Sequence, residues 1–136
     1  YVERLGAPAH PRDLQNTDHR IVGFLSSRTG KIDPLVLNGE SVRIEITGSY
    51  VLAVDDGNAY LEAGLAGLGV IALPVYMAAA HQAYGSLIPL FEDWRIDPMP
   101  LYLAFPPNRH VNAKLRVFID WIVELMQQHV PTSTHK

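Results

Sequence analysis

Residues 50–74, YVLAVDDGNAYLEAGLAGLGVIALP, place a stretch rich in alanine and glycine between two apolar runs. The first run, residues 50–54, predicts extended or tightly wound structure. The aspartate pair at 55–56 predicts the start of a helix, because Asp is a good N-cap and its charge suits the positive end of the helix dipole. Gly67 predicts the end of that helix, and residues 70–73 then predict a buried strand. This order favours an α/β fold with a largely parallel sheet.

Upstream of this stretch, three further segments have the pattern of strands. Residues 21–25 form a short apolar run, which is consistent with a buried strand. Residues 35–37 are strand-like and stop at Asn38-Gly39, a strong hairpin turn signal. Residues 42–46 alternate apolar and polar side chains, which is typical of a strand with one solvated face. We therefore expect a hairpin centred on Asn38-Gly39.

Downstream, the alternation of helix and strand continues. Pro74 suits the first position of a helix over residues 75–84, where its missing N–H costs nothing. Residues 87–90 predict an edge strand, because Pro89 removes a ladder donor. Residues 101–105 predict one more strand. The stripe of a final amphipathic helix recurs at spacings of four, three, four and three, in Val111, Leu115, Phe118, Ile122 and Leu125.

Composition indicates a folded domain that does not bind nucleic acid through its middle. The chain has 136 residues, of which 48% are hydrophobic and 18% charged, as in globular domains. The formal net charge is −3, and no Lys or Arg occurs between Arg43 and Arg95. Such a surface repels phosphates. The acids in that stretch are Glu45, Asp55, Asp56, Glu62, Glu92 and Asp93.

Other classes of protein are disfavoured by what the sequence lacks. There is no cysteine, which excludes disulfides and fits the cytoplasm. No apolar run approaches the roughly 18 residues of a membrane span, and residues 1–4 do not resemble a signal peptide. The first residue is not Met, and we expect a fragment of a longer protein. The six histidines have no metal-ligand spacing, and neighbouring acids such as Asp55 and Asp56 point apart, so we expect no metal site, no cofactor and no enzyme.

Eight short stretches together carry a family pattern. They are YVERLGAP (1–8), PRDL (11–14), HRIVGF (19–24), VDD (54–56), AGLGVIALP (66–74), GSLIPL (85–90), LYLAFPPNRH (101–110) and KLRVFID (114–120). In this order and spacing they resemble the effector-binding domain of LysR-type bacterial transcription regulators. The resemblance covers almost the whole chain, and its specificity lies in the collinear combination.

This resemblance implies a type 2 periplasmic-binding-protein-like fold, with two α/β lobes and a ligand in the cleft between them. Residues 1–96 would form most of the second lobe, and residues 97–100 a crossover hinge. Residues 101–130 would return to the first lobe as a strand and a C-terminal helix, and residues 131–136 would be a tail. The N-terminal helix-turn-helix, the linker helix and the front of the first lobe have no counterpart in this chain. DNA binding would therefore belong to the parent protein alone.

A ligand of such a sheet is expected outside the carboxyl ends of its strands, next to helix N-termini. The resemblance implies that two segments contribute, residues 23–26 and residues 54–57. In the first segment, Ser26 offers a hydroxyl, and Phe24 or Leu25 could form an apolar wall. The alternative is that Gly23 and Phe24 belong to the core and a turn, and that the aspartates are helix caps that repel an anion. The candidate ligand-binding residues are Gly23, Phe24, Leu25, Ser26, Asp55 and Asp56.

The small-residue helix over residues 59–66 has a second implied role. In the family, the corresponding helix packs against a first-lobe helix of a second subunit, giving an antiparallel dimer. The alternative is ordinary packing on the chain's own sheet. The candidate interface residues are Tyr60, Leu61, Gly64 and Leu65, and the expected assembly is a homodimer or homotetramer.

The function that follows is effector sensing. A small ligand, for example an organic or aromatic acid, would bind between lobes and shift their relative angle to control transcription. The main alternative is a periplasmic-type solute-binding protein for uptake, which has the same architecture but needs an export signal. An enzyme on this scaffold would need convergent reactive side chains, and the sequence offers none.

Overall fold

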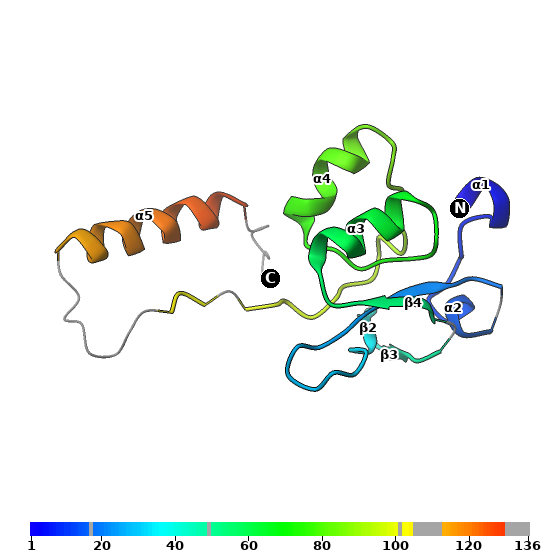
Figure 1. Cartoon of the computed structure of the whole chain (residues 1–136). Helices are drawn as coiled ribbons and strands as arrows, with labels where there is room; N and C mark the ends of the chain where they lie inside the picture. Colours follow the sequence, from blue (N-terminus) through cyan, green and yellow to red (C-terminus); the bar gives the residue numbers. More distant parts are fainter. Residues whose placement is uncertain (17, 49, 101, 105–112, 130–136) are drawn as a thin grey trace. The chain divides into compact units, whose positions relative to one another are not determined.

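The computed structural model describes residues 1–16, 18–48, 50–100, 102–104 and 113–129. The chain divides into two compact units, Tyr1–Pro98 and Met99–Lys136. Figure 1 shows the elements of both units. The first unit contains α1 (Val2–Leu5), α2 (Asp13–Asn16), β1 (Ile21–Phe24), β2 (Leu35–Asn38), β3 (Arg43–Ile46), β4 (Tyr50–Val54), α3 (Gly57–Leu65) and α4 (Val75–Ala83), and the second contains α5 (Ala113–His129).

The predicted parallel sheet is confirmed at β1 and β4, which pair side by side in the same direction. Val70 extends this sheet by a single parallel bridge to Ile21 on the other side of β1. The bridge consists of two hydrogen bonds: Val22 N–H donates to the Val70 carbonyl (3.0 Å), and Val70 N–H donates to the Arg20 carbonyl (2.8 Å). Helix α3 packs against both strands.

The predicted hairpin is confirmed as a separate antiparallel pair, β2–β3. Asn38 lies opposite Arg43, and Gly39 N–H donates to the Val42 carbonyl (2.8 Å) to close the turn. Arg95 bridges to Asn38 on the other edge of β2. The Asn38 side chain also donates to the Asp97 carboxylate (2.8 Å), which fixes the end of the first unit to this hairpin.

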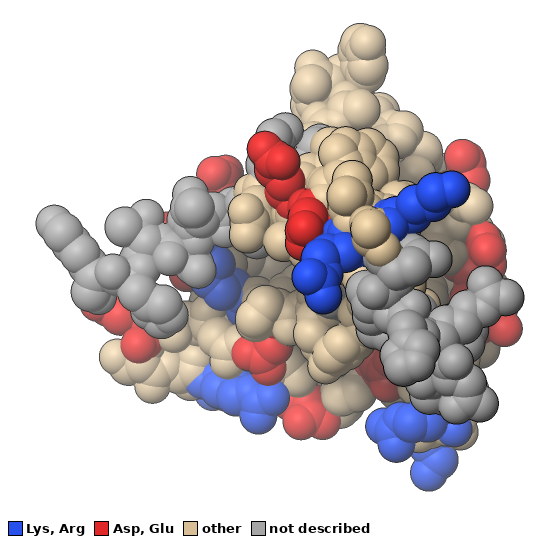
Figure 2. Space-filling view, turned by 90° about the vertical axis from the view of Figure 1, so that its left-hand side faces the viewer, with Lys and Arg blue, Asp and Glu red and all other residues tan. Residues whose placement is uncertain are grey.

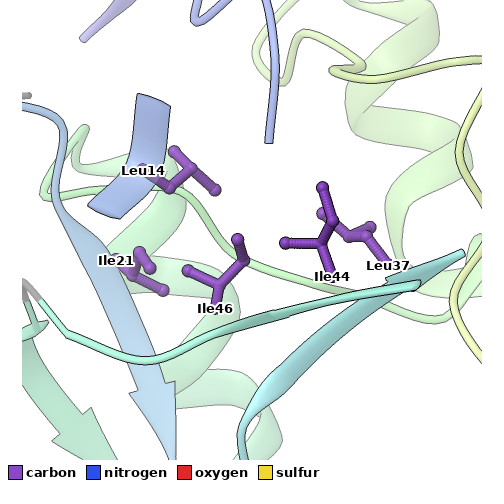
Figure 3. Close-up of a cluster of buried hydrophobic side chains, with 5 residues drawn as sticks. All are labelled: Leu14, Ile21, Leu37, Ile44 and Ile46. Atoms are coloured by element: carbon purple, nitrogen blue, oxygen red, sulfur yellow. The ribbon is translucent and has the colours of Figure 1, made fainter. Parts of the chain in front are cut away.

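The core of the first unit lies between the two pairs of strands. Alternation along β3 points Ile44 and Ile46 inward, as the polar and apolar pattern predicts. Burying each such side chain contributes about 1.5–3 kcal/mol. Figure 3 shows the larger buried cluster, which consists of Leu14, Ile21, Leu37, Ile44 and Ile46. A second cluster beneath α3 consists of Val22, Tyr60 and Ala63.

Three predicted strands are not formed as strands by the described residues. Residues 70–73 are reduced to the bridge at Val70, and residues 87–90 have no strand structure. Of the strand expected at 101–105, residues 101 and 105 lie outside the described residues, and 102–104 are not in a strand. A strand is defined by the neighbour that satisfies its N–H and C=O groups. Beyond the bridge at Val70, these segments have no such neighbour among the described residues.

The helices follow the sequence pattern more closely. Pro74 is the N-cap of α4 rather than its first residue, since its φ of −56° is helical but its ψ of 142° is extended. In the second unit, α5 (Ala113–His129) contains four residues of the predicted stripe, of which Leu115, Ile122 and Leu125 are half-buried and Phe118 is exposed. Val111, the first residue of that stripe, lies outside the described residues. No helix within the described ranges is long and apolar enough to cross a membrane.

Candidate functional site

The two segments expected to bind a ligand meet at one edge of the parallel sheet. Phe24 lies opposite Val54 in the last pair of β1 and β4, and Leu25 N–H donates to the Val54 carbonyl (2.7 Å). The chain then leaves β1 at Ser26 and leaves β4 at Asp55. Because both strands run in the same direction, their carboxyl ends and the residues after them share this edge.

Gly23 and Phe24 are packed into the fold at this edge. A Cβ on Gly23 would lie 2.9 Å from Cγ2 of Ile32, so any larger residue would force that side chain to shift. Asp33 N–H donates to the Phe24 carbonyl (2.9 Å). The Phe24 ring meets the Tyr60 ring edge-on, with centroids 5.4 Å apart and an interplanar angle of 80°. The segment 32–33 thus covers part of the expected wall.

Ser26 begins a tight turn. Its N–H donates to the Lys31 carbonyl (2.9 Å), and its carbonyl accepts from Thr29 (3.2 Å) and Gly30 (2.8 Å). The backbone N–H groups of Leu25 and Ser26 are therefore both occupied and do not offer an anion hole. The half-exposed Ser26 hydroxyl has no hydrogen-bond partner within the described part of the chain.

The two aspartates have different roles. Asp56 is the N-cap of α3, and its carboxylate accepts from the N–H groups of Asn58 (3.0 Å) and Ala59 (2.9 Å). Asp55 is exposed and makes no contact of this kind with the described residues. The positive end of α3 is thus already neutralised, and a second negative charge here would be repelled by both carboxylates.

Of the residues expected at a dimer interface, Tyr60 and Gly64 face the chain's own interior. Tyr60 is 6% exposed, and its hydroxyl accepts the N–H of Ala72 (3.1 Å). A Cβ on Gly64 would collide with the Ile71 side chain. Leu61 and Leu65 are half-buried. Ordinary packing on the sheet therefore accounts for Tyr60 and Gly64.

Burial raises the pKa of Tyr60 above its usual value, and the nearby Tyr50 adds to the rise. The hydrogen bond from Ala72 N–H acts in the opposite direction but is the smaller effect than burial. Since the reference value is already about 10, the phenol stays protonated at neutral pH. Tyr60 is thus an uncharged side chain that links α3 to Ala72 by a hydrogen bond and packs edge-on against the Phe24 ring.

Charge is scattered over the face shown in Figure 2, where acidic and basic side chains lie interspersed on a mostly uncharged surface. No group of three His, Asp or Glu side chains that could hold a metal ion occurs among the described residues.

A hollow of about 410 Å³ lies in the first unit, away from the residues expected to bind a ligand. Residues 69–73 and 85–91 both line it, together with Leu65, Leu37 and the three N-terminal residues Tyr1, Val2 and Glu3. Its lining is mostly aliphatic. Sequence patterns gave no sign of it, because they predicted two strands where the hollow has its walls.

Comparison with known families decides the relationship. The family description "LysR substrate binding domain" matches residues 1–127. The chain belongs to the LysR substrate-binding domain family. The family resemblance noted in the sequence is therefore confirmed.

Relatives of this LysR domain are named as transcription regulators. The uncharacterized HTH-type transcriptional regulator YhjC of Escherichia coli K12 is 32% identical over 132 residues, which are 96% of this chain and 43% of the relative. The uncharacterized HTH-type regulator YcaN of the same organism is 31% identical over 90% of this chain and 38% of its own length. The chain thus spans about two fifths of these relatives. They are not solute-binding proteins or enzymes by name, and they do not favour the uptake alternative.

A solved structure supports the fold assignment. The regulatory domain of AphB from Vibrio vulnificus matches with a TM-score of 0.69 and 24% identity, over 91% of this chain and 60% of that chain. The mixed α/β structure of this LysR domain is accordingly of the type 2 periplasmic-binding-protein-like class.

Proposed function

We propose that this LysR domain senses a small-molecule effector for a longer DNA-binding transcription regulator. The observation that carries the proposal is the family match over residues 1–127. The relatives named as HTH-type regulators support it further. The parent protein would bind DNA through an N-terminal domain outside this chain, as a homodimer or homotetramer, and would act in the cytoplasm, where bacterial DNA lies.

The effector would contact the edge where β1 and β4 end. Support comes from the pairing of Phe24 with Val54, which brings residues 23–26 and 55–56 together. Within this set, Ser26 is the best candidate for a direct polar contact, because its hydroxyl is half-exposed and not used by the described residues. Phe24 would supply apolar surface, held in place by the Tyr60 ring.

The charges at this edge constrain the orientation of an acidic effector. Asp56 occupies the N-terminal N–H groups of α3, and Asp55 adds a second exposed negative charge. A carboxylate on the effector would therefore lie away from α3, and an uncharged or donor group would face the aspartates. An organic or aromatic acid fits only in that orientation.

Binding controls transcription only if the effector prefers one arrangement of the two lobes over the other. The residues before the boundary between Pro98 and Met99 are fixed by the Asn38–Asp97 hydrogen bond. We propose that the pivot lies just after Asp97, within the hinge expected at residues 97–100.

The test replaces Ser26 by Trp in the full-length regulator and measures promoter activity against a panel of organic and aromatic acids. The variant should lose the response to the acid that activates or inhibits the wild type, while its far-ultraviolet circular dichroism stays unchanged. Thr29→Trp, in the same turn, is the matched control and should respond normally. An unchanged response of Ser26→Trp would remove Ser26 from the site, and a wild type that responds to no small molecule would count against effector sensing itself.

A further inference from the structure

Residues 94–97 lead up to the boundary of the first unit, which ends at Pro98, and the turn of the β2–β3 hairpin holds them. Asn38 N–H donates to the Arg95 carbonyl (2.7 Å), and Arg95 N–H donates to the Asn38 carbonyl (2.8 Å). This single antiparallel bridge attaches the segment to the end of β2. Two backbone hydrogen bonds stabilise such a contact only modestly, so the side chains around them decide how firmly the segment is held.

Two side chains of the hairpin hold Asp97. Asn38 donates from Nδ2 to Oδ1 of Asp97 (2.8 Å), and Nη2 of Arg43 lies 3.4 Å from Oδ2 of the same carboxylate. Asn38 and Arg43 are cross-strand partners, so their side chains leave the hairpin on one face. Arg43 and Asp97 are both more than half exposed, and an exposed ion pair contributes little by itself. The shorter hydrogen bond from Asn38 is therefore the main contact.

Trp94 adds an apolar contact at the same turn. A Cβ on Gly39 would lie 3.1 Å from Cζ3 of Trp94, so the ring packs directly on the backbone of the turn. The His10 ring meets the Trp94 ring edge-on, with centroids 5.3 Å apart and an interplanar angle of 87°. Trp94 itself is half-buried against the larger core cluster. The hairpin turn thus holds residue 94 by packing, residue 95 by backbone hydrogen bonds and residue 97 by side chains.

We propose that Asn38, Gly39 and Arg43 form a clamp on residues 94–97 that fixes where lobe movement begins and couples effector binding to that movement. This rests on the proposed function, in which the two lobes pivot just after Asp97. A clamped segment moves with the hairpin, so rotation of one lobe against the other is transmitted to β2. A segment released from the clamp would bend freely and absorb the rotation before it reached the hairpin.

Strand β2 connects this clamp to the candidate effector-binding edge. At one end, Ser26 N–H donates to the Lys31 carbonyl (2.9 Å) in the turn after β1. At the other end, β2 finishes with Asn38 in the clamp. Leu37 between them is buried in the larger core cluster. Residues 31–38 therefore span from the candidate site to the clamp, and tight packing lets a shift at one end reach the other.

The first experiment replaces Asn38 by Asp in the full-length regulator and follows amide hydrogen exchange without effector. Asn38→Asp keeps the size of the side chain but puts an oxygen where Nδ2 donates to Asp97, so two carboxylates repel each other. The amides of residues 38 and 95, which form the bridge, should exchange on the order of 10-fold faster. The swapped pair Asn38→Asp with Asp97→Asn exchanges donor and acceptor and should restore slow exchange. Ser41→Asp adds the same charge at an exposed residue of the same turn and should leave exchange unchanged.

The second readout is the distance between the two units in the same variants. Nitroxide labels at Ala80→Cys in α4 and Lys114→Cys in α5, both exposed positions, report this distance by pulsed electron paramagnetic resonance. Dilution with unlabelled regulator restricts the signal to pairs within one chain. Asn38→Asp should widen the distance distribution roughly 1.5-fold or more, and the swapped pair should narrow it again. Faster exchange with an unchanged distribution would overturn the proposal, because the contacts would then be structural only, and so would unchanged exchange.

The coupling is tested with the acid to which the wild type responds in the Ser26 promoter assay. Asn38→Asp should leave the Kd of that acid within about twofold, because residues 23–26 are unaltered, but should reduce the acid-dependent change in promoter affinity roughly 5-fold or more. A full-sized change in Asn38→Asp would contradict the coupling. A wild type that responds to no acid would count against the proposed function, whereas exchange and distance decide the clamp without any effector.

Discussion

Asp56 follows β4 in the chain, and its carboxylate caps the N-terminus of α3. It accepts from the N–H groups of Asn58 and Ala59, which would otherwise be unsatisfied. We expect Asp56→Ala to lower the free energy of unfolding by about 1 kcal/mol. Asp55→Ala, one residue earlier, should change it by less than about 0.5 kcal/mol, because Asp55 is exposed and caps nothing. Urea unfolding followed by circular dichroism measures both, and equal losses would show that the cap is not the stabilising feature.

Tyr60 predicts a specific loss of stability at high pH. Burial raises the pKa of its phenol in the folded chain above the reference value of 10.0. The folded state therefore holds this proton more tightly than the unfolded state, so stability is fully present below pH 10 and falls as pH rises through the folded pKa. Tyr50 has a raised pKa for the same main reason and would mask the effect.

The measurement therefore uses a Tyr50→Phe background. Unfolding free energy in that background should fall between neutral pH and the alkaline range, and adding Tyr60→Phe should flatten this fall. Tyr60→Phe should also cost about 1 kcal/mol at neutral pH, since Ala72 N–H loses its acceptor. An alkaline slope that is the same with and without the Tyr60 hydroxyl would contradict the assignment.

At the scale of elements, the contact between α3 and residue 71 depends on a missing side chain. A Cβ on Gly64 would collide with Cδ1 of Ile71, so one of the two segments would have to move. We expect Gly64→Ala to destabilise the fold by about 1–3 kcal/mol, and Ile71→Val, which removes that methyl, to recover part of the loss. Gly57→Ala is the control within the same helix, because its Cβ would meet only Cε of Met77 at 3.9 Å. Thermal unfolding of Gly64→Ala, of the double variant Gly64→Ala/Ile71→Val and of Gly57→Ala tests this, and a neutral Gly64→Ala would show that the helix can shift freely.

Elements specified by local chemistry were predicted from the sequence, and elements that need a distant partner were not. The Asp56 cap, α3 and the turn at Asn38-Gly39 depend on side chains and glycines within a few residues, and all three are confirmed. The runs at 70–73 and 87–90 have the composition of strands, but composition does not supply the neighbouring strand. For the same reason the hollow between them was not anticipated.

The sequence predicted that the two candidate segments lie at one edge of the sheet, but it did not predict the contacts that their residues make there. The rule that ligands bind beyond the carboxyl ends of parallel strands placed Ser26 and Asp55 at one edge, and the pairing of Phe24 with Val54 puts them there. The sequence could not indicate that Ile32 covers Gly23 or that Leu25 and Ser26 use their own N–H groups. Those contacts depend on how the loop after β1 folds back. The ligand-binding and dimer assignments themselves stay predictions.

At the scale of the whole molecule, this LysR domain spans 60% of the AphB regulatory domain. The apolar stripe of α5 belongs to a unit separate from the sheet that carries the candidate site. Effector control in the proposed sense needs both lobes and the helix-turn-helix, because a ligand shifts an equilibrium only by its differential affinity for two arrangements. We therefore expect the full-length regulator, and not the 136-residue chain alone, to change its DNA affinity with effector.

The most direct measurement of the central claim maps an effector on the full-length regulator. An organic acid that raises its thermal stability is selected first, and amide hydrogen exchange is then compared with and without that acid at equal salt concentration. The account predicts that protection gathers at residues 23–26 and 54–57 and at the hinge after Asp97, and that the same acid changes promoter binding. Protection confined to other parts of the domain, with residues 23–26 and 54–57 unchanged, would contradict it.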